Sequence, residues 1–111
     1  MRRVLLDDFD GLARAGLEEI VSAGHLELLA VDGADVVDRL VATLPDVVVL
    51  DLDLASCDDL ARRITTEFPA LTVVACSARR PTMRVYPRFR HGESFDSPLQ
   101  PDLLTTALTT T

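Results

Sequence analysis

The stretch Pro45-Asp46-Val47-Val48-Val49-Leu50-Asp51-Leu52-Asp53 decides how this sequence folds. It holds four consecutive apolar residues, most of them β-branched, which is typical of a strand buried on both faces of a parallel sheet. The proline in front and the acidic residues behind mark where that strand begins and ends. We therefore expect a central strand at 47–50 that is covered by helices on both sides and followed by carboxylates.

Strand and helix patterns alternate on both sides of this central segment. Short apolar runs predict strands at 4–6, 26–31 and 71–76, and apolar residues at helical spacing predict helices at 12–23, 36–44 and 58–68. Such alternation with short connections predicts an α/β fold with a parallel sheet. The length of 111 residues fits a single domain, 1–111.

The regular alternation ends after Ser77. Pro81 and Pro87 interrupt residues 78–91, where the next helix is expected, so we predict that this fourth helix is short, distorted or replaced by a loop. A brief fifth strand is expected at 94–95 and a weak terminal helix at 103–108. The threonine-rich tail, 105–111, is expected to fray or to begin a linker to an output domain.

The composition excludes several functions. The chain has 11 basic residues, all arginine, and 18 acidic residues, for a net charge of −7. Without lysine, a Schiff base or a phosphate-loop lysine is excluded, and the acidic balance argues against DNA binding by this domain itself. No apolar run is long enough to span a bilayer, and the two cysteines lack metal or redox spacing, so a cytoplasmic location is expected.

Acidic and hydroxyl side chains follow three of the predicted strands. Asp7-Asp8 follows the first, Asp51-Leu52-Asp53 ends the third, and Ser77 follows the fourth. The carboxyl ends of parallel strands meet at one edge, where ligands bind in open α/β sheets. Crowded carboxylates need a cation, and Mg²⁺ prefers such oxygen ligands. Acids after a strand are also common loop residues, so only their conjunction at one edge predicts a site.

Three segments, 4–8, 45–51 and 73–78, resemble the receiver domain of bacterial response regulators. Residues 12–17 are similar to the first helix of regulators that carry a LuxR-type helix-turn-helix output domain. The resemblance implies a flavodoxin-like (βα)5 fold with a parallel sheet in the order 2-1-3-4-5. It also implies that Asp51 accepts a phosphoryl group, that Asp8 ligates Mg²⁺, and that Asp7 assists through water. The backbone carbonyl of Asp53 would complete the metal shell, and Ser77 would bind a phosphoryl oxygen.

The sequence departs from the family pattern where the phosphoryl group would be sensed. The lysine that follows the fifth strand in the family is missing, and Ser97 stands nearest to its position. Ala55 and Asp59 replace a proline and a glycine that the family usually has after the phosphoacceptor. We hypothesise that Asp53 and Arg79 form a partly exposed ion pair across the mouth of the site, the alternative being two solvated charges.

Five arginines and no acidic residue lie between 79 and 91, where the family has its output surface. This segment is either a binding patch for an acidic partner or a solvated loop. Tyr86 and Phe89 lie among the arginines and could anchor the loop to the core. Cys57 and Cys76 are expected to have packing roles.

Three functions compete. The first is an atypical receiver domain with little or no phosphorylation-dependent switching, which regulates transcription through an attached or partner DNA-binding domain and acts by dimerisation, partner binding or ligand binding. The second is a conventional phosphoreceiver that accepts phosphate at Asp51 with Mg²⁺ from a sensor histidine kinase in a two-component phosphorelay. The third is a phosphatase of the haloacid-dehalogenase type, which Asp51-Leu52-Asp53-Leu54 resembles, but that family also needs a lysine. We expect a homodimeric signalling domain that is not an enzyme.

Overall fold

The computed structural model describes residues 2–7, 9, 11–29, 35–90 and 92–110. The described strands are β1 (Arg3–Leu6), β2 (Glu27–Leu29), β3 (Val47–Asp51), β4 (Thr72–Cys76), β5 (Thr82–Tyr86) and β6 (Phe95–Pro98). The described helices are α1 (Gly11–Ala23), α2 (Val36–Thr43), α3 (Cys57–Glu67) and α4 (Pro101–Thr110). The chain therefore alternates between strand and helix as far as β4, as the sequence predicts.

The strands form one mixed sheet in the order β2-β1-β3-β4-β5-β6. Pairing is parallel between β1 and β2, between β1 and β3, and between β3 and β4. Strand β5 runs antiparallel to β4, and β6 runs antiparallel to β5. The α/β class and the order 2-1-3-4 are confirmed, whereas the expectation of a purely parallel five-stranded sheet is wrong.

The difference arises in the segment where a degenerate fourth helix was expected. Its residues alternate along a strand, so that Met83 and Val85 enter one core while Tyr86 enters the other. Pro81 and Pro87 lie immediately outside this five-residue strand and therefore interrupt none of its hydrogen bonds. The expected fifth strand is present as β6, but β5 displaces it to the sixth position of the sheet.

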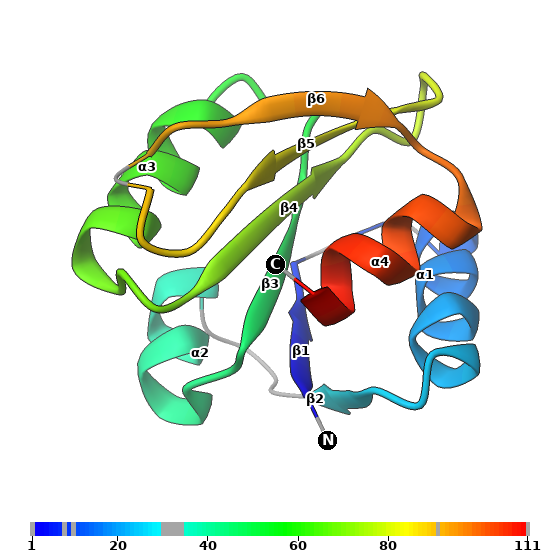
Figure 1. Ribbon diagram of the computed structural model, residues 1–111, viewed down its shortest axis with the longest axis horizontal. Helices are drawn as coiled ribbons and strands as arrows, with labels where there is room; N and C mark the ends of the chain where they lie inside the picture. Colours follow the sequence, from blue (N-terminus) through cyan, green and yellow to red (C-terminus); the bar gives the residue numbers. More distant parts are fainter. Residues whose placement is uncertain (1, 8, 10, 30–34, 91, 111) are drawn as a thin grey trace.

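Helices cover both faces of the sheet. Figure 1 shows α1 and α4 on one side and α2 and α3 on the other. Val47 and Val49 pack with α1 and α4, whereas Val48 and Leu50 pack with α2 and α3. All four side chains are at most 1% exposed, which confirms the prediction of a strand buried on both faces.

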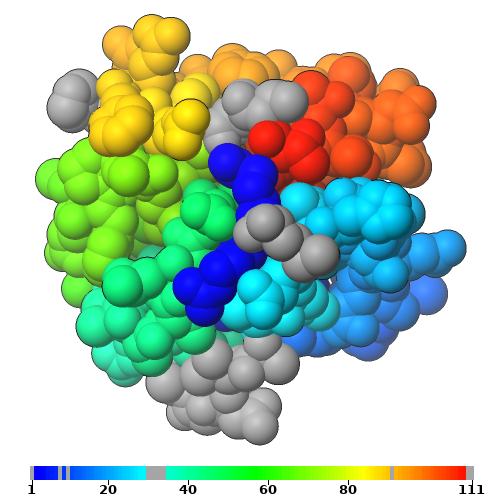
Figure 2. All heavy atoms as spheres, turned by 60° about the horizontal axis from the view of Figure 1, so that its bottom comes forward, coloured from blue at the N-terminus to red at the C-terminus, as the bar shows by residue number. Residues whose placement is uncertain are grey.

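The start of the chain contacts both α4 and the segment that precedes β3. The Arg2 Nε donates to the carbonyl oxygen of Leu108 at 2.8 Å, and the amide of Arg3 donates to the Asp46 carboxylate at 2.8 Å. Figure 2 shows the dark blue start of the chain between green and cyan segments, with the red end of α4 beside it. The first contact ties α4 to the start of β1, and the second ties β1 to the residue that precedes β3.

The threonine-rich tail is helical from residue 105 to residue 110. The hydroxyls of Thr105, Thr106 and Thr109 each donate to the carbonyl four residues earlier. These bonds satisfy the hydroxyls on the helix itself, and the burial of Ala107 and Leu108 supplies the packing that propensity alone does not give. Within the described part of the chain, no helix combines the length and the apolar character that crossing a membrane requires.

Candidate functional site

The carboxyl ends of β1, β3 and β4 meet at one edge of the sheet. Asp51 is paired with Cys76 across β3 and β4, and the amide of Asp7 donates to the Val49 carbonyl at 2.9 Å. The residues that end or follow these strands, Asp7, Asp51 and Ser77, therefore lie at the same edge, as the sequence predicts. In this fold such an edge is where ligands ordinarily bind.

The Ser77 hydroxyl is engaged by its own neighbourhood. Its Oγ donates to Oδ1 of Asp53 at 2.6 Å, and the Ala78 amide donates to the other carboxylate oxygen at 2.9 Å. The amides of Arg79 and Arg80 donate to the same Oγ at 3.1 and 3.0 Å. The hydroxyl that the family resemblance assigns to a phosphoryl oxygen is therefore bonded to a carboxylate.

This arrangement follows from the antiparallel turn between β4 and β5. Residues 77–81 reverse the chain, and the Ser77 amide donates to the Thr82 carbonyl at 3.2 Å to close the turn. Serine side chains commonly accept from backbone amides in such turns. The carboxylate of Asp53 reaches this turn from the loop after β3, so it joins two of the strand ends.

The charge on Asp53 is favoured by its partners. The Ser77 hydrogen bond lowers the pKa of this carboxyl below its usual value, and the Ala78 amide and the positive charge of Arg79 add to the effect. Among the described residues, no ion pair joins Asp53 directly to the Arg79 guanidinium. The hypothesised ion pair at the mouth of the site is therefore not formed in the described structure. Ser77 and Ala78 are the bonded partners of Asp53, and Arg79 acts on it only through a longer-range attraction.

A buried arginine pairs with the first carboxylate of the site. Nη2 of Arg39 lies 3.3 Å from Oδ1 of Asp7, and Nη1 donates to the Leu6 carbonyl at 3.4 Å. Asp7 is 8% exposed and Arg39 is 5% exposed. A buried carboxylate needs such a partner, because desolvation without compensation costs several kcal/mol.

The position of Arg39 follows from the face of α2 on which it lies. Asp35 accepts from the Asp38 amide at 2.9 Å and caps the helix. Val36, Arg39 and Leu40 share the buried face, at the spacing that an amphipathic helix gives to its core residues. Sequence reasoning missed this residue, although an arginine at an apolar position of the helix was the available signal.

Two of the described carboxylates have partners within the protein. The Asp7 carboxylate faces the Arg39 guanidinium, and that of Asp53 faces Ser77 and Ala78. These contacts do not involve the backbone carbonyl of Asp53, which is the predicted ligand at that position. The described residues contain no group of three or more side chains suited to hold a metal ion. Asp8, the predicted direct ligand, lies outside the described residues, and Mg²⁺ binding stays a prediction.

The remaining predicted site residues, Asp51 and Ser97, lie on strands that are not neighbours in the sheet. One carboxylate oxygen of Asp51 accepts the Asp53 amide at 3.0 Å, and Asp51 is partly exposed. Ser97 lies in the same row of the sheet, reached through Cys76 and Met83. Three strand spacings place it about 14 Å from Asp51, beyond the reach of a serine side chain. The inserted strand β5 causes this separation.

Residues 82–86 of the arginine-rich segment form the strand β5, so this part of it is not a solvated loop. Tyr86 is fully buried and its hydroxyl donates to Asp58 at 2.6 Å, so its predicted role as an anchor is confirmed. Arg84 binds both carboxylate oxygens of Asp96 at 2.7 and 3.3 Å, which links β5 to β6. Phe89 is 62% exposed at the turn that follows β5.

Both cysteines are buried free thiols in the described structure. Burial raises the pKa of Cys57 to about 11, and the charge of Asp51 adds to the effect. Burial likewise raises the pKa of Cys76 to about 12. Each thiol is therefore protonated at neutral pH and packs as a small apolar group, in the separate cores on the two faces of the sheet.

Two comparisons with known proteins found no relative. No protein-family model matches this chain. A search of curated proteins also found no match.

Proposed function

We propose that this chain is a receiver-like regulatory domain that works with little or no phosphorylation of Asp51. It acts by dimerisation or by binding a partner or a ligand, and it regulates transcription through an attached or partner DNA-binding domain. The α/β architecture with the order 2-1-3-4 and the acidic residues at the carboxyl edge support this proposal. They are compatible with a flavodoxin-like receiver arrangement that carries β5 in place of a helix.

One observation carries the proposal. The Ser77 hydroxyl donates to Asp53 at 2.6 Å, so the group that would bind a phosphoryl oxygen already holds a carboxylate. A phosphoryl group on Asp51 would have to displace this carboxylate or lie beside it. The negative charges of the phosphoryl group and of the Asp53 carboxylate would then repel each other.

Two further features support the same conclusion. The chain has no lysine that could pair with a phosphoryl group. The guanidinium of Arg39 neutralises Asp7, which gives the acidic edge an internal cation. Asp7 therefore already has a positively charged partner within the protein.

A conventional phosphoreceiver is the second candidate. It is favoured by the placement of Asp7, Asp51 and Ser77 at one edge, where a carboxylate nucleophile could accept a phosphoryl group. In that case a sensor histidine kinase would be the partner.

Phosphorylation by a small donor separates the two candidates. Wild-type protein, Asp51→Asn and Asp53→Ala are incubated with acetyl phosphate and Mg²⁺, and their intact masses are measured. We expect no adduct on the wild type and unchanged dimerisation of Asp51→Asn. We also expect that Asp53→Ala, which frees Ser77, accepts phosphate more readily than the wild type. A stoichiometric adduct on the wild type that is lost in Asp51→Asn would overturn the proposal and establish the second candidate.

A further inference from the structure

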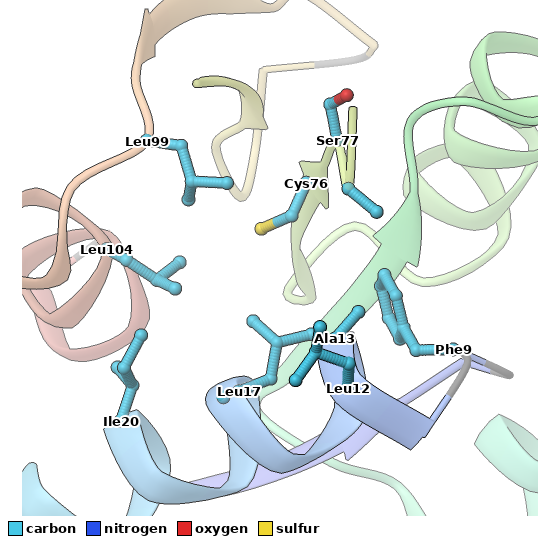
Figure 3. A pocket seen from close by; sticks show the side chains of 11 residues that line it. Phe9, Leu12, Ala13, Leu17, Ile20, Cys76, Ser77, Leu99 and Leu104 are labelled. Carbon is cyan, nitrogen blue, oxygen red and sulfur yellow. The ribbon is translucent and has the colours of Figure 1, made fainter. Parts of the chain in front are cut away.

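A pocket of about 340 Å³ opens between α1, α4 and the end of β4. Its floor consists of core residues, because Leu17, Cys76 and Leu104 are each at most 8% exposed. Figure 3 shows the sulfur of Cys76 directed into the space that Leu17, Leu99 and Leu104 surround. The pocket therefore reaches the core that lies on the α1 and α4 face of the sheet.

Two of the residues that α1 contributes to the lining are small. Ala13 and Gly16, one helical turn apart, both line it. A Cβ atom added at Gly16 would meet nothing within 4 Å. Protein interiors are ordinarily packed with few voids, so an opening of this size next to the core is a feature with room for a ligand.

The lining is apolar and uncharged. No charged side chain of the described residues lines the pocket. Its one thiol, Cys76, is protonated because burial raises its pKa to about 12. Figure 3 shows the Ser77 oxygen turned away from the space, in agreement with its hydrogen bond to Asp53. Leu12 extends this apolar surface at the mouth, where it is 88% exposed.

We infer that this pocket binds an uncharged, predominantly apolar small molecule. Its volume lies at the lower end of the range of about 300–1,000 Å³ that is usual for small-molecule sites. A charged ligand would lose its hydration without gaining a partner from the described lining residues, none of which carries a charge. The inference deepens the proposed function and rests on it, since it names the ligand class through which a phosphate-independent domain would be controlled.

The pocket and the acidic edge share a residue. Ser77 lines the pocket and also holds the carboxylate of Asp53. A ligand that packs against the end of β4 therefore contacts the turn that closes the acidic edge. Ser77 is thus a common neighbour of the pocket and of the acidic edge.

The test uses N-phenyl-1-naphthylamine, an uncharged fluorescent probe, titrated into the whole chain. The absence of tryptophan keeps the background emission low. We expect saturable binding of one probe per chain with a blue-shifted emission. Gly16→Leu adds a bulky side chain to the lining, so the affinity of the chain for the probe should fall by at least about tenfold, and Ala13→Leu should act in the same direction. Gly11→Leu is the matched control, because Gly11 also lies on α1, faces open space and does not line the pocket.

Circular dichroism melting shows whether each variant is folded. Because Gly16→Leu replaces a helical glycine, this variant should melt no lower than the wild type. Absence of saturable binding to the wild type, or equal binding by Gly16→Leu and Gly11→Leu, would overturn the inference. Light scattering gives the oligomeric state. A dimer that excludes the probe and that Gly16→Leu disrupts would mean that a second copy fills the pocket, and this result would also overturn the inference. Phosphorylation of Asp51 would overturn the proposed function without removing probe binding, so the two failures are distinguishable.

Discussion

Replacing Arg39 by methionine removes the positive charge that faces Asp7 while keeping most of the side-chain volume. The two charged atoms are 3.3 Å apart, which corresponds to an attraction of about 5 kcal/mol at an effective dielectric constant of about 20. Desolvation of both ions offsets much of this attraction in the wild type. In the variant, however, Asp7 stays buried without this partner, and breaking such a pair ordinarily costs about 3–5 kcal/mol.

The assay is urea unfolding followed by circular dichroism, since the chain has no tryptophan. We expect Arg39→Met to lower the free energy of unfolding by about 3–5 kcal/mol, a large part of the roughly 5–15 kcal/mol that domains possess. Adding Asp7→Asn should restore part of the loss, because it removes the buried negative charge that Arg39 no longer faces.

Arg14→Met is the matched control for this experiment. Arg14 forms an ion pair of 2.9 Å with Glu18 on the surface of α1, and such a pair contributes about 0.3–0.5 kcal/mol. If Arg39→Met costs no more than Arg14→Met, or if Asp7→Asn adds to its effect instead of relieving it, the buried pair does not stabilise the acidic edge as we argue.

Further predictions concern the other polar and buried groups. Tyr86→Phe should cost about 1.5 kcal/mol in urea unfolding, because it removes a hydrogen bond to the charged Asp58. The Tyr86 hydrogen bond and the Arg62 charge lower the pKa of Asp58, so this difference should be largest at neutral pH and shrink as the pH falls through that lowered pKa; a difference that is unchanged in strong acid would contradict it. Cys57 and Cys76 should not react with a disulfide reagent at pH 8 unless denaturant is added, and rapid labelling of the native protein would show that burial does not protect them. Mg²⁺ should raise the melting temperature of the wild type little, whereas a large, saturable rise would show that the carboxylates bind it despite Arg39.

The residues after β4 show where sequence reasoning failed. In the sequence, Pro81 and Pro87 look like interruptions of a helix, because three preceding strand-helix pairs favour a helix at this point. A strand of five residues fits between them, and the alternation of Met83 and Val85 with Arg84 was the available signal. Short apolar segments are compatible with either structure, so packing against β4 decided between them.

The candidate site was predictable in its position but not in its contacts. Asp51 and Ser77 follow buried strands, and parallel pairing alone brings them to one edge. The hydrogen bond from Ser77 to Asp53 depends on the tight turn into β5, which the sequence pattern did not indicate. The contact between Arg39 and Asp7 depends on how α2 is rotated against the sheet. The spacing of the apolar residues of α2 does not fix this rotation by itself, because it also depends on the core against which the helix packs.

The sequence by itself determined the buried central strand at 47–50, the alternation up to β4, the edge at which the acidic residues gather and the absence of lysine. These properties follow from local patterns, since β-branched runs and helical spacing act over a few residues. The tertiary structure decided that β5 extends the sheet in the antiparallel direction and that Ser97 lies far from Asp51. It also decided that Arg39 pairs with Asp7 and that Ser77 donates to Asp53. Those outcomes depend on which segments pack together, because hydrogen bonds and ion pairs between distant residues form only after the sheet has placed them within reach.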